Sequence, residues 1–235
     1  RLGYDGKGQY VIRQNADIEP AWASLGGVPL ILEAFVAFER EVSVIAVRSR
    51  NGEFRHYPLT RNWHRDGILS VSLAPLPGDP DLEARAVDRA RTLAEHLDYV
   101  GVFALELFVV DGSLLGNEMA PRVHNSGHWT IEGAVCSQFE NHVRAVLGLP
   151  LGDTRANGYS AMLNWIGELP DAKPVLAESR GHWHDYGKSS RAGRKVGHAT
   201  VCADSPTELA DRLRRIGLAL GREAQVRPAV EVLTS

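Results

Sequence analysis

Two glutamates twelve positions apart are the residues in this sequence best suited to holding a divalent cation. Glu106 lies between Leu105 and Leu107 in an apolar run, and Glu118 follows Asn117 beyond an Asp-Gly turn. Burying an unpaired carboxylate is costly, and two neighbouring carboxylates repel, so a cation between them would relieve both penalties. Mg²⁺ is often held by one or two carboxylates together with substrate phosphates. The pattern favours a magnesium site, with an edge strand carrying solvated charges as the alternative.

A glycine-rich stretch at residues 3–9 has the composition of a loop that covers a polyphosphate. Its glycines let backbone NH groups approach a ligand closely, and Lys7 adds a positive charge. The spacing matches neither the Walker loop nor the dinucleotide-binding fingerprint. A glycine-rich hairpin turn is an equally good interpretation of these residues alone. They are Gly3, Tyr4, Asp5, Gly6, Lys7, Gly8 and Gln9.

The polar loop (residues 121–130) has no apolar period but is rich in hydrogen-bond donors. It carries two histidines and Trp129, which favour a lined pocket over a solvated linker. A loop that merely caps the following helix is the alternative.

The basic segment (residues 188–195) concentrates positive charge in a chain whose net charge is −3. Such a cluster suits a phosphate monoester, although charge runs are more often solvated faces. Its cations are Lys188, Arg191, Arg194 and Lys195. Further upstream, residues 33–41 could form a hinge against which a nucleoside packs, or a plain strand end.

The elements that must position these residues are mostly strands in hairpins. Strands are expected over 10–13, 28–35, 41–48, 54–58, 68–73, 102–110, 113–119, 161–166 and 197–201. Helices are expected over 17–26, 81–97, 132–147 and 206–220. This pattern predicts an α+β fold with a largely antiparallel sheet. We expect three parts: residues 1–34 with the glycine loop, 35–152 with the metal and substrate site, and a small C-terminal domain at 153–235.

Bulk composition excludes some functions. The net charge of −3 provides no general attraction to nucleic acid or to an anionic membrane, so neither is an expected partner. Two cysteines give no disulfide framework, and no apolar run approaches the roughly 20 residues of a membrane span, which together favour the cytoplasm. The sequence opens without Met and directly on the glycine loop, which suggests that it is a piece of a longer protein.

Taken in order, these segments resemble the N5-carboxyaminoimidazole ribonucleotide synthetases, which are ATP-grasp enzymes of purine biosynthesis. The resemblance covers nearly the whole chain, and residues 120–133 are its most specific part. It implies an ATP-grasp fold with a small C-terminal domain, and an N-terminal Rossmann-like domain that these residues do not include. It also implies that ATP and bicarbonate carboxylate 5-aminoimidazole ribonucleotide through carboxyphosphate, usually in a homodimer. Mg²⁺, or Mn²⁺ in its place, would be the metal.

The resemblance also implies roles for individual residues. Residues 3–9 would close over the ATP phosphates, the adenine would lie against Glu33, Ala34, Phe35 and Val36, and Glu41 would hold the ribose. His64 and Asn117 would lie near the nucleotide, and Glu106 and Glu118 would bind the metal. Substrate would meet Tyr4, Asp5, Arg122, His124, Asn125, Ser126, Lys188 and Arg194, of which Asp5, Arg122 and Lys188 would be catalytic.

Two departures from the family pattern affect no functional side chain: Leu2 stands where glycine is common, and Val123 where proline is common. Another ATP-grasp ligase, such as a formate-using purine transformylase or a biotin carboxylase-like protein, would share the carboxylate pair but not the polar loop. A non-catalytic nucleotide-binding module would be expected to have lost Lys7, Glu106 or Glu118, and all three are present.

Overall fold

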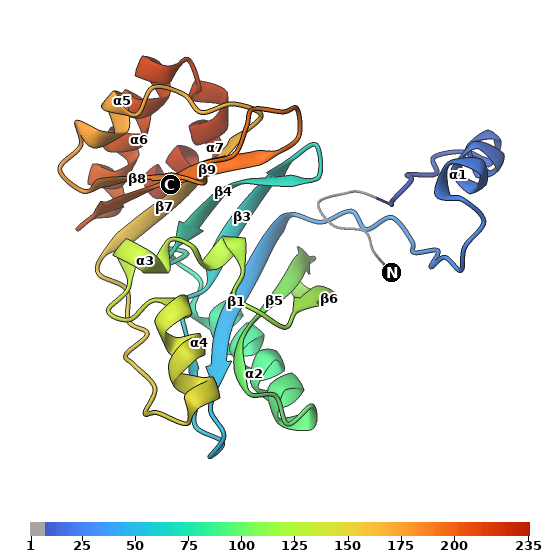
Figure 1. The fold of residues 1–235 in the computed structure, drawn as a ribbon, viewed down its shortest axis with the longest axis horizontal. Helices are drawn as coiled ribbons and strands as arrows, with labels where there is room; N and C mark the ends of the chain where they lie inside the picture. Colours follow the sequence, from blue (N-terminus) through green and yellow to red (C-terminus); the bar gives the residue numbers. More distant parts are fainter. Residues whose placement is uncertain (1–7) are drawn as a thin grey trace.

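A single antiparallel sheet organises the chain in the computed structural model, which describes residues 8–235 (Figure 1). The strand order is β6-β5-β1-β3-β4-β7-β9-β8, with β2 paired to β1, and every pairing is antiparallel. The α+β prediction is therefore confirmed. The strands are β1 (Arg40–Arg48), β2 (Phe54–His56), β3 (Thr60–Arg65), β4 (Ile68–Ala74), β5 (Gly101–Val110), β6 (Ser113–Ala120), β7 (Tyr159–Ile166), β8 (Gly181–Asp185) and β9 (Lys195–Ala203).

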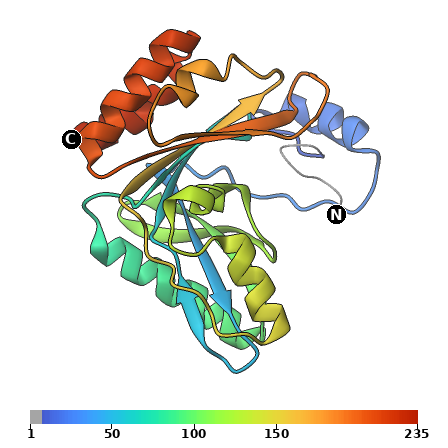
Figure 2. The same cartoon turned by 60° about the vertical axis from the view of Figure 1, so that its left-hand side comes forward.

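Helices cover both faces of this sheet, and strand alternation decides which face each one meets (Figure 2). Val42, Val44 and Ala46 of β1 share a core with α2, whereas Ile45 and Val47 share one with α4. A third core joins α6 and α7 to β4, β7 and β9. The helices are α1 (Ile18–Leu25), α2 (Pro80–His96), α3 (Thr130–Gly133), α4 (Gln138–Leu147), α5 (Lys173–Leu176), α6 (Pro206–Leu220) and α7 (Glu223–Thr234). None of the helices within residues 8–235 is both long and apolar enough to cross a membrane.

The helix α2 shows how directly some of these elements follow from sequence. Asp79 caps its first turn by accepting a hydrogen bond from the Leu82 backbone NH at 3.2 Å, and Pro80 opens the helix. Leu82, Ala86 and two further alanines then recur on one buried stripe. The prediction of a helix over 81–97 is confirmed.

The predicted strands at 10–13 and 28–35 are wrong. These residues form no regular strand, and Ile31, Leu32 and Phe35 are 87%, 85% and 80% exposed. An apolar run raises strand propensity, but a strand exists only where another strand accepts and donates its ladder hydrogen bonds. No strand within residues 8–235 pairs with this segment, and α1 lies apart from the sheet (Figure 1).

The predicted helix over 132–147 is also wrong as a single element. Ala134 is extended, and the backbone NH groups of Val135 and Cys136 each donate to a carbonyl of residues 153–155 at 3.0 Å. Ser137 then starts α4 by accepting from the Glu140 NH at 3.2 Å. The break between α3 and α4 thus exists because long-range backbone pairing replaces helical hydrogen bonds there.

Candidate functional site

The two predicted metal-binding glutamates lie directly opposite one another. Glu106 of β5 and Glu118 of β6 are register partners, so their side chains emerge on the same face of the hairpin. The register then shifts, so that Leu107 pairs with Gly116 and Asn117 is the extra residue of a β-bulge. The predicted hairpin is therefore confirmed, and the bulge sets the spacing of its polar residues.

Glu106 is a buried carboxylate, and one of its two oxygens lacks a hydrogen-bond partner among residues 8–235. It is 8% exposed, and within the described residues its Oε1 accepts no hydrogen bond. Its pKa is raised to about 7, mainly by burial; the charges of Glu118 and Glu41 contribute to the rise, and those of His64 and Lys195 oppose it. A divalent cation is the group this arrangement fits, because it would satisfy the orphaned oxygen and offset the repulsion.

These side chains cannot enclose a metal by themselves. Within residues 8–235, no group of three or more His, Cys, Asp or Glu side chains lies close enough to hold a metal ion. Mg²⁺ typically fills its remaining positions with water and substrate phosphates. The pair therefore suits a metal that arrives with a phosphorylated ligand.

A relay of hydrogen bonds connects the sheet to the polar loop beside Glu106. Ser72 Oγ donates to Asn62 Oδ1 at 2.7 Å, and Asn62 Nδ2 donates to Ser43 Oγ at 2.9 Å. Ser43 Oγ in turn donates to Ser126 Oγ at 2.9 Å, which lies 2.9 Å from His124 Nδ1. All three serines and Asn62 are buried, so the relay holds the loop against β1, β3 and β4.

The relay decides the protonation state of His124. Its Nδ1 receives both the Ser126 hydroxyl and, at 3.4 Å, the Ser126 backbone NH, so it must be an acceptor. Burial lowers the pKa of His124 to about 3, and the charges of Arg122 and Lys195 add to this effect. The 3.6 Å approach of His124 Nδ1 to Glu106 Oε1 is therefore a contact between a neutral ring and a carboxyl group, and not an ion pair.

Asn125 is held by a second set of hydrogen bonds that reaches β4 and β7. Asn164 Nδ2 donates to the Leu69 carbonyl at 2.8 Å and to Asn125 Oδ1 at 2.6 Å. Asn125 Nδ2 then faces Asn164 Oδ1 at 3.3 Å and His128 Nδ1 at 3.2 Å. The orientation of Asn125 is thus set by a main-chain carbonyl.

The basic segment reaches the same region, although it lies far from the polar loop in the sequence. The pKa of His128 is lowered to about 4, mainly by burial and in part by the charge of Lys195. Lys188 Nζ lies over the Tyr186 ring at 5.0 Å, and the Tyr186 hydroxyl lies 3.4 Å from His128 Nδ1. Carboxylates, polar loop and basic segment therefore share one site.

Comparison with known proteins agrees with this geometry. The model of the ATP-grasp domain matches residues 1–139. The chain belongs to the ATP-grasp family. Residues 160–212 match the phosphoribosylaminoimidazole carboxylase C-terminal domain. The predicted ATP-grasp fold with an additional C-terminal domain is confirmed.

Individual relatives of this ATP-grasp chain confirm the predicted resemblance. N5-carboxyaminoimidazole ribonucleotide synthase of Pseudomonas aeruginosa is 60% identical over 88% of this chain and 57% of its own length. The synthetase of Thermus thermophilus is 55% identical, with a TM-score of 0.85, and 90% of this chain and 59% of that chain align. The Aspergillus clavatus synthase, solved with ADP and 5-aminoimidazole ribonucleotide, is 32% identical, with a TM-score of 0.80 over 96% of this chain and 59% of that one. This chain therefore spans less than two thirds of each.

Other predicted site residues of the ATP-grasp chain lie at the periphery or outside the described region. Gly3, Tyr4, Asp5, Gly6 and Lys7 fall outside residues 8–235, so the glycine loop stays a prediction. The remaining peripheral residues are Gly8, Gln9, Glu33, Ala34 and Phe35, all exposed, and Val36, which is half-buried. No side chain of these six is fixed against the carboxylate pair by an ion pair or side-chain hydrogen bond that the structure shows.

Four more predicted residues have partners that the sequence did not indicate. Glu41 and His64 contact each other across β1 and β3, and both charges reach Glu106. Arg194 Nη1 donates to Ser189 Oγ at 3.1 Å and so braces the basic segment. Arg122 is exposed and donates to the Val123 carbonyl at 3.1 Å.

Sequence reasoning missed two residues that hold the site together. Ser43 stands between Val42 and Val44, and Asn164 between Leu163 and Trp165, so each has buried apolar neighbours in its strand. A polar residue at a buried strand position must find a hydrogen-bond partner, which is the signal that could have identified both.

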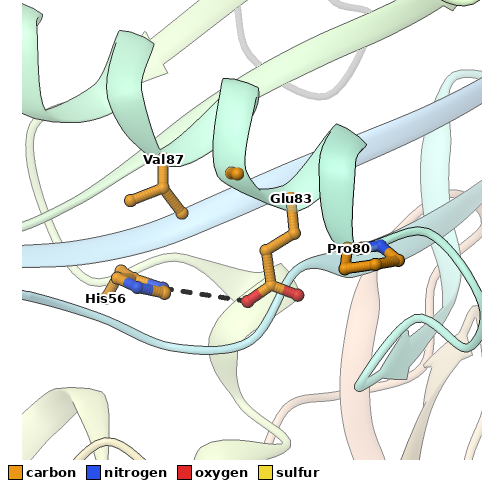
Figure 3. Close-up of a pocket in the computed structure, with 5 residues that line it drawn as sticks. His56, Pro80, Glu83 and Val87 are labelled. Atoms are coloured by element: carbon orange, nitrogen blue, oxygen red, sulfur yellow. Dashed lines mark ion pairs between the residues drawn. The ribbon is translucent and has the colours of Figure 1, made fainter.

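A surface hollow beside α2 lies elsewhere and is not part of this site. It is lined by His56, Pro80, Glu83, Ala84 and Val87, with most of its wall supplied by α2 (Figure 3). Its one ionic contact joins His56 Nδ1 and Glu83 Oε1 at 3.9 Å. Nothing in its lining matches the chemistry of the carboxylate site.

Proposed function

We propose that this protein carboxylates 5-aminoimidazole ribonucleotide to N5-carboxyaminoimidazole ribonucleotide, using ATP and bicarbonate. The observation that carries the proposal is the convergence on one site of Glu106 opposite Glu118, the polar loop and the basic segment. The identity to synthases of this name supports the same reaction. The carboxylate pair alone would support only binding of a metal and a nucleotide.

The proposed reaction divides into two transfers. A bicarbonate oxygen attacks the γ-phosphorus of ATP, ADP leaves, and carboxyphosphate forms. The exocyclic amine of the ribotide then forms a bond to the carboxyl carbon, phosphate leaves, and the amine loses a proton. Positioning and charge neutralisation are the main tasks of a protein in phosphoryl transfer.

Side chains of this protein would carry out the positioning and the charge neutralisation. Glu106 and Glu118 would hold Mg²⁺ or Mn²⁺, which when bound neutralises charge on the phosphates. Lys7 and the glycine loop would cover the polyphosphate, Glu41 would hold the ribose, and His64 would lie near the nucleotide. Neutral His124, with its Nδ1 engaged by Ser126, has only its Nε2–H left to donate to a ligand.

The ribotide would lie between the polar loop and the basic segment. Arg122, Lys188 and Arg194 supply cations for its phosphate, and Asn125 and Ser126 shape the wall of the site. Asp5 and Tyr4 would approach from the glycine loop.

We also propose that the chain divides into three parts, with boundaries at residues 34/35 and 152/153. We propose further that the protein forms a homodimer and that it is located in the cytoplasm.

ADP release by the full-length protein tests this proposal directly. We expect ATP turnover to require both bicarbonate and 5-aminoimidazole ribonucleotide, and to yield the N5-carboxylated ribotide by mass spectrometry. Matched reactions replace bicarbonate with formate, or the ribotide with biotin. Turnover that responds to formate with a formylated product, or to biotin, would instead indicate a different ATP-grasp ligase.

A further inference from the structure

Three histidines at and behind the polar loop form a connected group that the proposed reaction does not use. His198 of β9 is 2% exposed, and its ring stacks on that of His184 with centroids 4.1 Å apart and planes within 5°. His184 Nε2 lies 2.7 Å from Glu132 Oε1 in α3. Tyr186 joins this group to the polar loop, because its hydroxyl lies 2.8 Å from His198 Nδ1 and 3.4 Å from His128 Nδ1.

Hydrogen-bond directions in this group follow from one backbone carbonyl. The Leu69 carbonyl can only accept, so it fixes which end of the Asn164 amide carries hydrogens. Asn164 Nδ2 donates to Asn125 Oδ1, which makes Asn125 Nδ2 the donor to His128 Nδ1. His128 Nδ1 is therefore an acceptor, and its ring is neutral with the proton on Nε2. Burial favours the same neutral state for His128 and His198.

Tyr186 also sits at the base of the basic segment. Its backbone NH donates to the Val196 carbonyl at 3.0 Å, at the end of the β8–β9 pairing. Two residues later, the Lys188 ammonium lies 5.0 Å from the centre of the Tyr186 ring. One side chain thus contacts β9 and the polar loop through its hydroxyl, and the exposed lysine through its ring.

We propose that Tyr186 is a positioning residue for the ribotide site: its hydroxyl fixes the ring against the polar loop and β9, and the ring holds Lys188 beside that loop. The inference rests on the proposed function, since Lys188 is there a cation for the ribotide phosphate. An unrestrained lysine loses much rotamer freedom when it binds. A side chain already held over an aromatic ring loses less, so affinity is gained without a further contact.

The decisive measurement is calorimetric titration of the full-length protein with 5-aminoimidazole ribonucleotide, and separately with Mg·ADP. Tyr186→Phe removes the hydroxyl and keeps the ring. Loss of one net hydrogen bond predicts ribotide affinity weaker by about fivefold to tenfold, with Mg·ADP affinity unchanged. Tyr186→Leu, which also removes the ring, is expected to weaken ribotide binding more.

Tyr99→Phe is the matched control, because it removes a hydroxyl that donates to the Val102 carbonyl at 2.9 Å, away from the site. It should lose comparable thermal stability and leave ribotide affinity unchanged. A double-mutant cycle with Lys188→Ala separates positioning from general stability. If Tyr186 acts through Lys188, adding Tyr186→Phe to Lys188→Ala has little further effect.

Each result decides between the interpretations. Wild-type ribotide affinity in Tyr186→Phe, or a full additive loss in the double variant, would overturn the positioning role while leaving the proposed function standing. A wild-type protein that binds Mg·ADP but no ribotide would overturn the proposed function, and the role of Tyr186 with it.

Discussion

Replacing Glu106 with Gln should stabilise the metal-free protein, and the gain should grow with pH. The carboxyl group is buried, its Oε1 has no partner within the described residues, and its pKa is raised from 4.5 to about 7. A folded-state pKa above the unfolded one means that the folded protein holds the proton more tightly. The associated stability is present below pH 4.5 and is lost as pH rises through about 7.

The size of the stability change follows from the rise in the pKa of Glu106. At about 1.4 kcal/mol for each pH unit, ionising Glu106 in the folded state costs roughly 3 kcal/mol, an order-of-magnitude figure. The free energy of unfolding of Glu106→Gln, relative to wild type, should therefore increase by up to this amount between pH 4.5 and 8. In a protein of this size, a change of roughly 3 kcal/mol shifts the midpoint of thermal unfolding by about 6–12 °C.

Thermal unfolding with chelator present, scanned from pH 4.5 to 8.5, measures this difference. Glu118→Gln is the matched control: it removes a neighbouring charge, but burial is the larger cause of the raised pKa, so most of the pH dependence should remain. Adding Mg²⁺ with ADP at pH 8 should stabilise wild type more than Glu106→Gln. Parallel pH profiles for wild type and Glu106→Gln would refute the reasoning, because Glu106 would then titrate as a solvated carboxylate.

Three other substitutions probe separate parts of the structure. Glu118→Gln should abolish bicarbonate-dependent ADP release, and near-normal turnover would remove the metal assignment. Gly133→Ala would place a Cβ 2.2 Å from Ser160 Oγ, so it should destabilise by about 1–3 kcal/mol in urea unfolding, and an unchanged midpoint would count against the packing described. Ser205→Ala removes the cap that accepts from the Glu208 NH at 3.2 Å, and should cost about 1 kcal/mol in the same assay; no loss would mean that the cap is not made in solution.

Elements with a strong local signal were predictable from the sequence. The hairpin of β5 and β6 follows from two apolar runs on either side of Asp111-Gly112, where both residues have positive φ. That turn, with the run lengths, was enough to bring Glu106 near Glu118. The bulge at Asn117 was not predictable, because it depends on how two strands already in contact adjust their register.

Strand β3 was missed because its buried residues are polar. Thr60 and Asn62 occupy the inward positions, 0% and 3% exposed, between arginines and a tryptophan. No apolar alternation marks such a strand. Its inward side chains are instead satisfied by distant groups, as when Trp129 Nε1 donates to Thr60 Oγ1 at 3.1 Å. Only the assembled fold supplies those partners.

Helix α7 was missed for the opposite reason, since a local signal argues against it. Pro228 stands inside the helix, where it removes a hydrogen bond and normally predicts an end. Val226, Ala229 and Leu233 are nevertheless buried in the core that α7 shares with α6 and β4. Burial of that stripe outweighs the local cost of about 3 kcal/mol.

The polar loop could be recognised from its local composition, but its position could not be predicted, because that position depends on distant residues. Its composition predicts a ligand-binding segment, whereas its position depends on Ser43 and Asn62, which lie much earlier in the chain. Each buried member of that relay has its partner, so removing one leaves another unsatisfied at a cost of about 1–3 kcal/mol. Such a network therefore strongly favours one position of the loop over alternative positions. The neutral acceptor state of His124 follows from that position, so the chemistry available beside Glu106 depends on a buried relay that begins in the sheet at Ser43 and Asn62.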